Sequence, residues 1–141
     1  MVQTFGIIGS GSWATALAKI LTDNKHAVNW WIRNAETIEH FRKRHHNPHY
    51  LSSVNFDVSL LTISANMEKV INNSDILVVA IPSAFVEESF VNLPDNIFQG
   101  KKIVSAIKGI LPNKNILFNY YLQQQFGVPL ENYFEIGRAH V

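Results

Sequence analysis

The chain has 141 residues, of which 47% are hydrophobic and 16% charged, and its 12 basic and 11 acidic side chains leave a net charge of +1. This length suits a single domain with one core, and the apolar fraction argues against disorder. Such a balanced charge does not suggest binding to nucleic acid or to a membrane surface. The sequence has no cysteine, which excludes disulfides, thiolate metal sites and a cysteine nucleophile. We also expect no signal peptide and no spanning segment, since an apolar run of about 18 residues is missing.

Apolar runs alternate with segments of helical periodicity along the chain. Strands are predicted at residues 5–8, 27–32, 60–63, 76–81, 102–106 and 133–136. Between them, helices are predicted at residues 13–24, 34–44, 64–71, 85–91 and 115–126. We expect Asn34 and Ser64 to cap two of these helices and Gly127 to end the last one.

The alternation of strand and helix indicates the fold class. Successive βαβ units with nearly continuous apolar strands are typical of a parallel sheet that is covered by helices on both faces. The sequence therefore predicts an α/β, doubly wound, mainly parallel sheet with helices on both faces.

A glycine-rich turn follows the first predicted strand and opens the first helix. Its sequence, Gly9-Ser10-Gly11-Ser12-Trp13-Ala14, matches the G-x-G-x-x-G/A fingerprint of Rossmann-type dinucleotide-binding domains. Gly9 would permit the tight turn, Gly11 would let a pyrophosphate approach the backbone, and Ala14 would allow close packing of helix on strand. The phosphates would lie on free N–H groups at the helix N-terminus. The alternative is a glycine-rich turn that binds no ligand.

Three further positions lie where parallel strands end. Arg33 follows the second strand, where NAD-binding folds usually carry an acidic residue, and a guanidinium there can pair with a 2′-phosphate. Pro82 follows the fourth strand and Lys108 the fifth, at the edge that faces the ligand crevice. For Arg33 and Lys108 the alternative is an ordinary solvated side chain.

Other residue groups invite weaker interpretations. His40, His45, His46 and His49 lie close in sequence, but without a cysteine or a carboxylate pair nearby we expect a polar loop and no metal site. Phe118, Tyr121, Leu122 and Phe126 recur at helical spacing and predict core packing. We also expect packing roles for Trp13, Trp30 and Trp31, with contact to a bound ligand as the alternative for Trp13 at the glycine turn.

Five motifs in this order resemble the bacterial-type NAD(P)-dependent glycerol-3-phosphate dehydrogenases. Besides the glycine turn, they are residues 31–33, residues 47–51, residues 74–83 and residues 105–110. The family commonly has Gly where this chain has Ala14, a change that the fingerprint tolerates.

The resemblance implies a cytoplasmic oxidoreductase that reduces dihydroxyacetone phosphate to sn-glycerol 3-phosphate for phospholipid synthesis, with NADPH or NADH as cofactor. It also implies that Ser12, Trp13 and Arg33 contact the dinucleotide and that Lys108 contacts both dinucleotide and substrate. A cation beside the ketone would stabilise the developing alkoxide. A homodimer is a further expectation for the full-length form, with no nucleic-acid or membrane partner.

The resemblance also predicts how the chain is divided. The family's principal catalytic lysine lies in a C-terminal substrate domain, which we expect to be absent, leaving residues 1–135 as the NAD(P)-binding domain. Residues 136–141 match the translation of a common short-read sequencing adapter (ATC GGA AGA GCA CAC GTC TGA), so we expect a non-native tail. This chain alone should bind NADPH weakly and reduce no substrate.

Two other functions stay open. One is another Rossmann dehydrogenase, of the 3-hydroxyacyl-CoA or 6-phosphogluconate type, although Lys108-Gly109 and residues 47–51 argue against it. The other is a non-catalytic module that senses dinucleotide levels.

Overall fold

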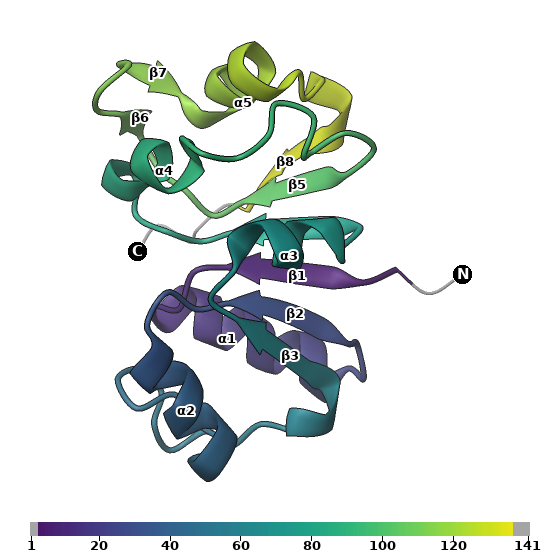
Figure 1. The fold of residues 1–141 in the computed structure, drawn as a ribbon, viewed down its shortest axis with the longest axis vertical. Helices are drawn as coiled ribbons and strands as arrows, with labels where there is room; N and C mark the ends of the chain where they lie inside the picture. The colour runs from purple at the N-terminus through teal and green to yellow at the C-terminus, as the bar shows by residue number, and fades with distance from the viewer. Residues whose placement is uncertain (1–2, 137–141) are drawn as a thin grey trace.

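In the computed structural model, which describes residues 3–136, strands and helices alternate along the chain (Figure 1). The eight strands are β1 (Phe5–Ile8), β2 (Val28–Trp31), β3 (Leu61–Ser64), β4 (Ile76–Val79), β5 (Lys102–Ser105), β6 (Ile110–Leu111), β7 (Ile116–Leu117) and β8 (Tyr133–Glu135). The five α-helices are α1 (Ser12–Asp23), α2 (Ala35–Arg44), α3 (Met67–Asn72), α4 (Ser83–Phe90) and α5 (Phe118–Phe126). Short 3₁₀ helices η1 (Val58–Leu60) and η2 (Leu130–Asn132) precede β3 and β8.

Six of these strands form one sheet in the order β3-β2-β1-β4-β5-β8, and every pair in it is parallel. In Figure 1 their arrowheads therefore point to the same edge of the sheet. The chain starts in the middle of the sheet, builds outward to β3, and then crosses back to place β4 on the other side of β1. Ligand crevices of open parallel sheets lie at such a reversal, outside the carboxyl ends of the strands.

The two faces of the sheet bury separate groups of side chains because successive residues of a strand point to opposite faces. Ile7 packs with residues of α1 and α2, including Ala14, Ala18 and Phe41. Its neighbour Ile8 packs with residues of α3, α4 and α5 on the other face. The predicted doubly wound sheet with helices on both faces is confirmed, and the predicted stripe of α5 lies in this second core, at positions Phe118, Tyr121, Leu122 and Phe126.

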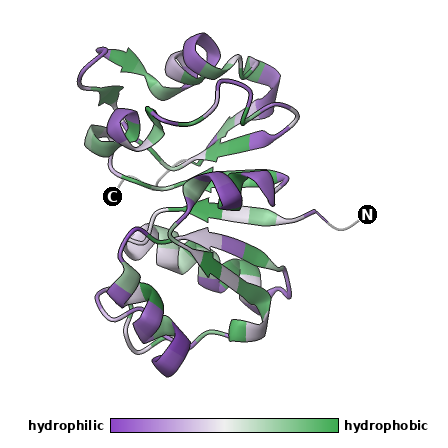
Figure 2. Cartoon of the chain, in the orientation of Figure 1, coloured by the Kyte–Doolittle hydropathy of each residue, from purple (hydrophilic) through white to green (hydrophobic). Residues whose placement is uncertain are grey.

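Hydropathy follows this layering. Figure 2 shows much of the sheet in green and much of α2 in purple, as expected for a helix that buries little more than Thr37 and Phe41. Asn34 caps α2 as predicted, since its Oδ1 accepts hydrogen bonds from the N–H groups of Glu36 and Thr37 at 2.8 and 3.3 Å. The helix ends at His45, which takes a left-handed backbone conformation with φ of 62°.

Two sequence predictions were wrong in detail. Asn66, not Ser64, caps α3, because Ser64 is the last residue of β3 and its Oγ accepts the N–H of Asn66 at 3.0 Å. The helix expected over 115–126 begins only at Phe118. The preceding residues pair instead in the antiparallel two-stranded sheet of β6 and β7, with Ile110 opposite Leu117.

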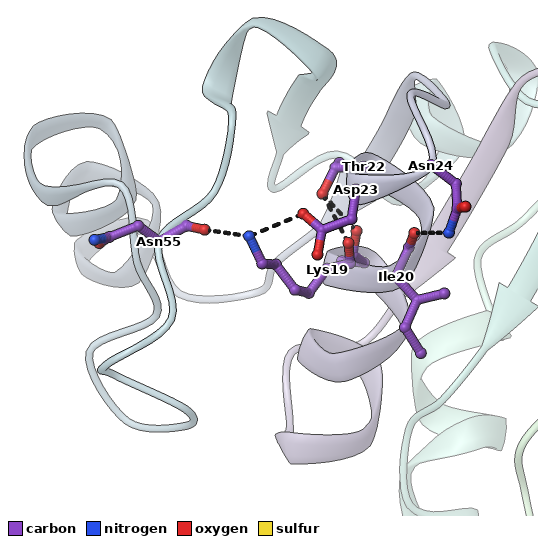
Figure 3. Close-up of polar contacts among 7 residues, drawn as sticks. Lys19, Ile20, Thr22, Asp23, Asn24 and Asn55 are labelled. Atoms are coloured by element: carbon purple, nitrogen blue, oxygen red, sulfur yellow. Dashed lines mark hydrogen bonds and ion pairs between the residues drawn. The ribbon is translucent and has the colours of Figure 1, made fainter.

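The long connection between α2 and η1 is held against α1. Lys19 of α1 donates from its Nζ to the carbonyl oxygen of Asn55 at 2.6 Å and pairs with Asp23 Oδ1 at 2.9 Å (Figure 3). Phe56 follows directly and is buried against Trp30 and Phe41. This connection therefore has a fixed position relative to α1.

Within residues 3–136, the structure contains no helix of the length and apolar character needed to cross a bilayer. Most of the predicted non-native tail, residues 137–141, lies outside the described part of the chain.

Candidate functional site

A cavity of about 620 Å³ opens at the carboxyl edge of the parallel sheet. This volume lies in the range of small-molecule and cofactor sites, roughly 300–1,000 Å³. Most of its lining comes from the loops that follow β1, β2, β4 and β5, and the rest from α4 and from the connection after α2. The lining residues are Gly9, Ser10, Gly11, Ser12, Trp13, Trp31, Arg33, Tyr50, Ala80, Ile81, Pro82, Ser83, Phe85, Ser89, Ala106, Ile107 and Lys108.

Gly9 is required at the start of the glycine turn by both backbone conformation and space. Its φ is +125°, which side-chain-bearing residues rarely adopt. A Cβ at Gly9 would lie 2.5 Å from the carbonyl oxygen of Ala80, just beyond β4. The turn therefore passes directly against the strand on the other side of the sheet reversal.

Gly11 and the first turn of α1 form an uncapped helix N-terminus. No side chain caps α1, and its first helical hydrogen bond runs from the N–H of Thr15 to the carbonyl of Gly11 at 2.9 Å. The N–H groups of Ser12, Trp13 and Ala14 consequently have no intrahelical acceptor. A Cβ at Gly11 would meet nothing within 4 Å, so the space beside the turn is open. Such an N-terminus favours an anion through both its N–H groups and the helix dipole.

The charges around the cavity have one sign. Arg33 and Lys108 line it, both with exposed side chains, and its described lining includes no Asp or Glu. The two cations come from the ends of β2 and β5, on either side of the glycine turn. This arrangement is suited to a ligand with phosphates at more than one position.

Aromatic side chains provide the apolar part of the cavity. Trp13, Trp31, Tyr50 and Phe85 all line it. Trp31 is only partly buried, and its Nε1 donates to the carbonyl of Ala65 at 2.9 Å, so the predicted packing role covers only part of what this residue does. The Nε1 of Trp13 is buried and has no hydrogen-bond partner among residues 3–136.

The structure brings most of the predicted site residues together. Eight of them line one cavity, namely Gly9, Ser10, Gly11, Ser12, Trp13, Arg33, Pro82 and Lys108. Ala14 lies elsewhere, fully buried between α1 and the sheet, where its small side chain serves the close packing that the fingerprint requires. Tyr50, Phe85 and Ser89 also line the cavity and were not predicted from the sequence.

The histidines lie away from the cavity lining. The rings of His40 and His46 pack edge to face with centroids 4.7 Å apart. Burial of the His40 ring and the neighbouring His46 lower the pKa of His40 below its ordinary value. Across residues 3–136, no three His, Asp or Glu side chains are grouped closely enough to hold a metal ion.

The fold and this site define a nucleotide-binding α/β domain of the Rossmann class. The sequence profile described as "NAD-dependent glycerol-3-phosphate dehydrogenase N-terminus" matches residues 4–133. The chain belongs to this family of dehydrogenase N-terminal domains.

Curated relatives agree with this assignment. The glycerol-3-phosphate dehydrogenase [NAD(P)+] of Agathobacter rectalis is 38% identical over 108 residues, which cover 77% of this chain and 32% of the relative. That of Corynebacterium jeikeium is 31% identical over 131 residues, which cover 93% of this chain and 39% of the relative. The matched part of the chain thus spans 32 to 39% of the length of these proteins.

Solved structures show the same fold. Glycerol-3-phosphate dehydrogenase from Coxiella burnetii superimposes with a TM-score of 0.79 at 20% identity, covering 90% of this chain and 38% of that one. The enzyme from Plasmodium falciparum gives 0.77 at 26% identity, covering 91% and 39%. An imine reductase from Myxococcus stipitatus in complex with NAD+ gives 0.64 at 17% identity, covering 96% and 40%, which extends the likeness in fold beyond glycerol-3-phosphate dehydrogenases.

Proposed function

We propose that this chain is the NAD(P)-binding part of a glycerol-3-phosphate dehydrogenase. The observation that carries the proposal is the uncapped N-terminus of α1, which opens into a cavity whose charged lining residues, Arg33 and Lys108, are both cationic. A dinucleotide has a pyrophosphate for the helix N-terminus and aromatic rings for the apolar part of the cavity. The family to which the chain belongs and the names of its curated relatives support the same cofactor.

Different residues of the cavity bind different parts of the dinucleotide. Residues 9–13 hold the pyrophosphate through backbone N–H groups, with Ala14 packing the helix beneath them. Arg33, at the end of β2, pairs with a 2′-phosphate, which makes NADPH a better ligand than NADH. Pro82 lines the wall after β4, on the far side of the turn.

Lys108 is the residue of the cavity that we expect to contact both the cofactor and the substrate. When bound, the reduced nicotinamide supplies a hydride to a ketone carbon. The ammonium group of Lys108 provides positive charge at the cavity for the phosphorylated substrate and for the alkoxide that develops on its oxygen. Reduction of dihydroxyacetone phosphate to sn-glycerol 3-phosphate, for phospholipid synthesis in the cytoplasm, is the activity proposed for the full-length protein.

Other parts of the whole protein remain predictions from the family resemblance. These are a C-terminal substrate domain with the principal catalytic lysine, the division at residue 135, and a homodimeric full-length form. Other Rossmann dehydrogenase activities and a dinucleotide sensor share the same proposed cofactor site, so substrate reduction by the full-length protein separates them.

Fluorescence titration with NADPH tests the proposal. Trp13 and Trp31 line the cavity, so bound NADPH should quench their emission and gain emission from its reduced nicotinamide by energy transfer. Inorganic pyrophosphate and ADP-ribose should compete with it. Saturable quenching that competes in this way supports the proposal, whereas tryptophan emission unchanged by NADPH contradicts it.

A further inference from the structure

Three buried side chains donate hydrogen bonds to the backbone of the glycine turn. Trp30 Nε1 donates to the carbonyl of Gly9 at 2.6 Å, and Asn47 Nδ2 donates to the carbonyl of Ser10 at 3.1 Å. Thr15 Oγ1 donates to the carbonyl of Gly11 at 2.7 Å. Three consecutive carbonyl groups of the turn therefore each have a side-chain donor.

These donors all lie on the core side of the turn. Trp30 and Thr15 are fully buried, Asn47 is 1% exposed, and the cavity lining includes none of the three. In a trans peptide the C=O and the following N–H point in opposite directions, and the described chain contains no cis peptide. Carbonyls drawn toward the core leave the N–H groups of Ser10, Gly11 and Ser12 pointing the other way.

Asn47 is the centre of this arrangement because it uses both ends of its amide. Besides the carbonyl of Ser10, its Nδ2 also donates to Thr15 Oγ1 at 3.0 Å. The Thr15 hydroxyl in turn donates to the carbonyl of Gly11, so Asn47 is linked to two carbonyl groups of the turn. Its Oδ1 accepts the N–H groups of His49 and Tyr50 at 2.9 and 3.2 Å. A buried amide with all of these partners satisfied is rigid, and it ties the loop that presents Tyr50 to the turn that opens α1.

We propose that Asn47, acting through Ser10 and Thr15, is a positioning residue that presets the backbone of the glycine turn for a diphosphate and at the same time fixes Tyr50 at the cavity. This inference rests on the proposed function. A turn that is free to rotate its peptide units could present carbonyl oxygens to the phosphates, which would repel them. Preset N–H groups lose no such freedom on binding, so affinity rises without a new contact.

NADPH titration of the 141-residue chain and of matched variants tests the proposal. Asn47→Ala should weaken NADPH binding about tenfold, since each lost hydrogen bond contributes on the order of 1 kcal/mol and 1.4 kcal/mol is a factor of ten. Thr15→Val should weaken binding as well, whereas Thr15→Ser keeps the hydroxyl and should bind like the wild type.

Lys19→Met is the matched control. It removes the other anchor of the connection after α2, the hydrogen bond to Asn55, but touches neither the turn nor the cavity lining. Thermal unfolding of each variant reports any general loss of stability. The proposal predicts that Lys19→Met lowers stability and leaves NADPH affinity unchanged.

Two results would overturn the proposal. If the wild type binds NADPH and Asn47→Ala binds no more weakly than Lys19→Met, Asn47 does not position the turn, and the proposed function stands. If Thr15→Val and Thr15→Ser bind equally well, the hydroxyl relay has no role. Failure of the wild type to bind NADPH overturns the proposed function, and this inference with it.

Discussion

Arg33 is the side chain at the carboxyl edge of the sheet that we expect to distinguish NADPH from NADH. Arg33 stands where a carboxylate would select against a 2′-phosphate, and its side chain is exposed at the cavity rather than engaged in an ion pair of the described chain. Its charge is therefore accessible to a ligand.

Arg33→Ala should lower the affinity for NADPH much more than the affinity for NADH. A charge-assisted hydrogen bond contributes about 1.5–3 kcal/mol, so the loss for NADPH should be roughly tenfold or more. Equilibrium titrations with both cofactors measure the difference, and Arg42→Ala, on the exposed side of α2, is the control. An equal loss for the two cofactors would show that Arg33 does not contact a 2′-phosphate.

The residue scale is also where the sequence was least informative. Gly9, Gly11 and Arg33 were found because a local pattern places them at strand ends. Asn47 belongs to the motif of residues 47–51, but no local pattern shows its role, since its partners Ser10 and Thr15 lie 37 and 32 positions away in the chain. Tyr50 belongs to the same motif, and only the folded structure brings it to the cavity.

At the scale of elements, the prediction succeeded where apolar runs were long and failed where they were short. The six strands of the parallel sheet were all predicted, most clearly β4, because a buried parallel strand is continuously apolar. β6 and β7 have two residues each, too few to show alternation, and their segment was assigned partly to the start of α5. Helix starts were likewise uncertain by a few residues, as the capping of α3 by Asn66 shows.

The N-terminus of α2 offers a direct test of one predicted element boundary. Asn34→Ala removes the acceptor of two backbone N–H groups and should lower the free energy of unfolding by about 1 kcal/mol. Urea denaturation measures this change. Asn113→Ala, whose exposed side chain lies outside any helix, should leave the free energy nearly unchanged. Equal effects of the two substitutions would contradict the capping role.

For the whole molecule, Tyr133 of β8 should make the free energy of unfolding depend on pH in the alkaline range. Burial raises the pKa of Tyr133 to about 12, although a hydrogen bond to Ser105 acts in the opposite direction. The nearby Glu135 carboxylate raises this pKa further, and the phenol donates to Glu135 Oε1 at 3.1 Å. The folded state therefore retains the phenolic proton at a pH where the unfolded chain has lost it.

The sign of the pH effect follows from this shift. A raised folded-state pKa contributes stability that is complete below pH 10 and is lost as the pH rises toward about 12. Tyr133→Phe should therefore show a shallower decline in unfolding free energy over this interval than the wild type. Tyr120→Phe, at an exposed position of α5, should keep the wild-type slope. Identical slopes for Tyr133→Phe and the wild type would rule out this contribution.

At the same scale, the proposed site covers only part of what the proposed reaction requires. The chain's described residues form the proposed cofactor cavity, whose lining includes the cation Lys108, while the relatives it matches are more than twice as long. Cofactor binding is therefore the part of the proposed function that experiments on this chain can test.

Backbone amide mapping by ¹H–¹⁵N NMR during NADPH titration tests the central claim most directly. The largest shifts should fall on the amides of Ser10, Gly11, Ser12 and Trp13, with the side chain of Trp31 also affected. The amides of η1, which precedes β3 and therefore lies at the opposite edge of the parallel sheet, should hardly move. Shifts centred away from the start of α1, or an unchanged glycine turn at saturating NADPH, would contradict a pyrophosphate bound at this helix N-terminus.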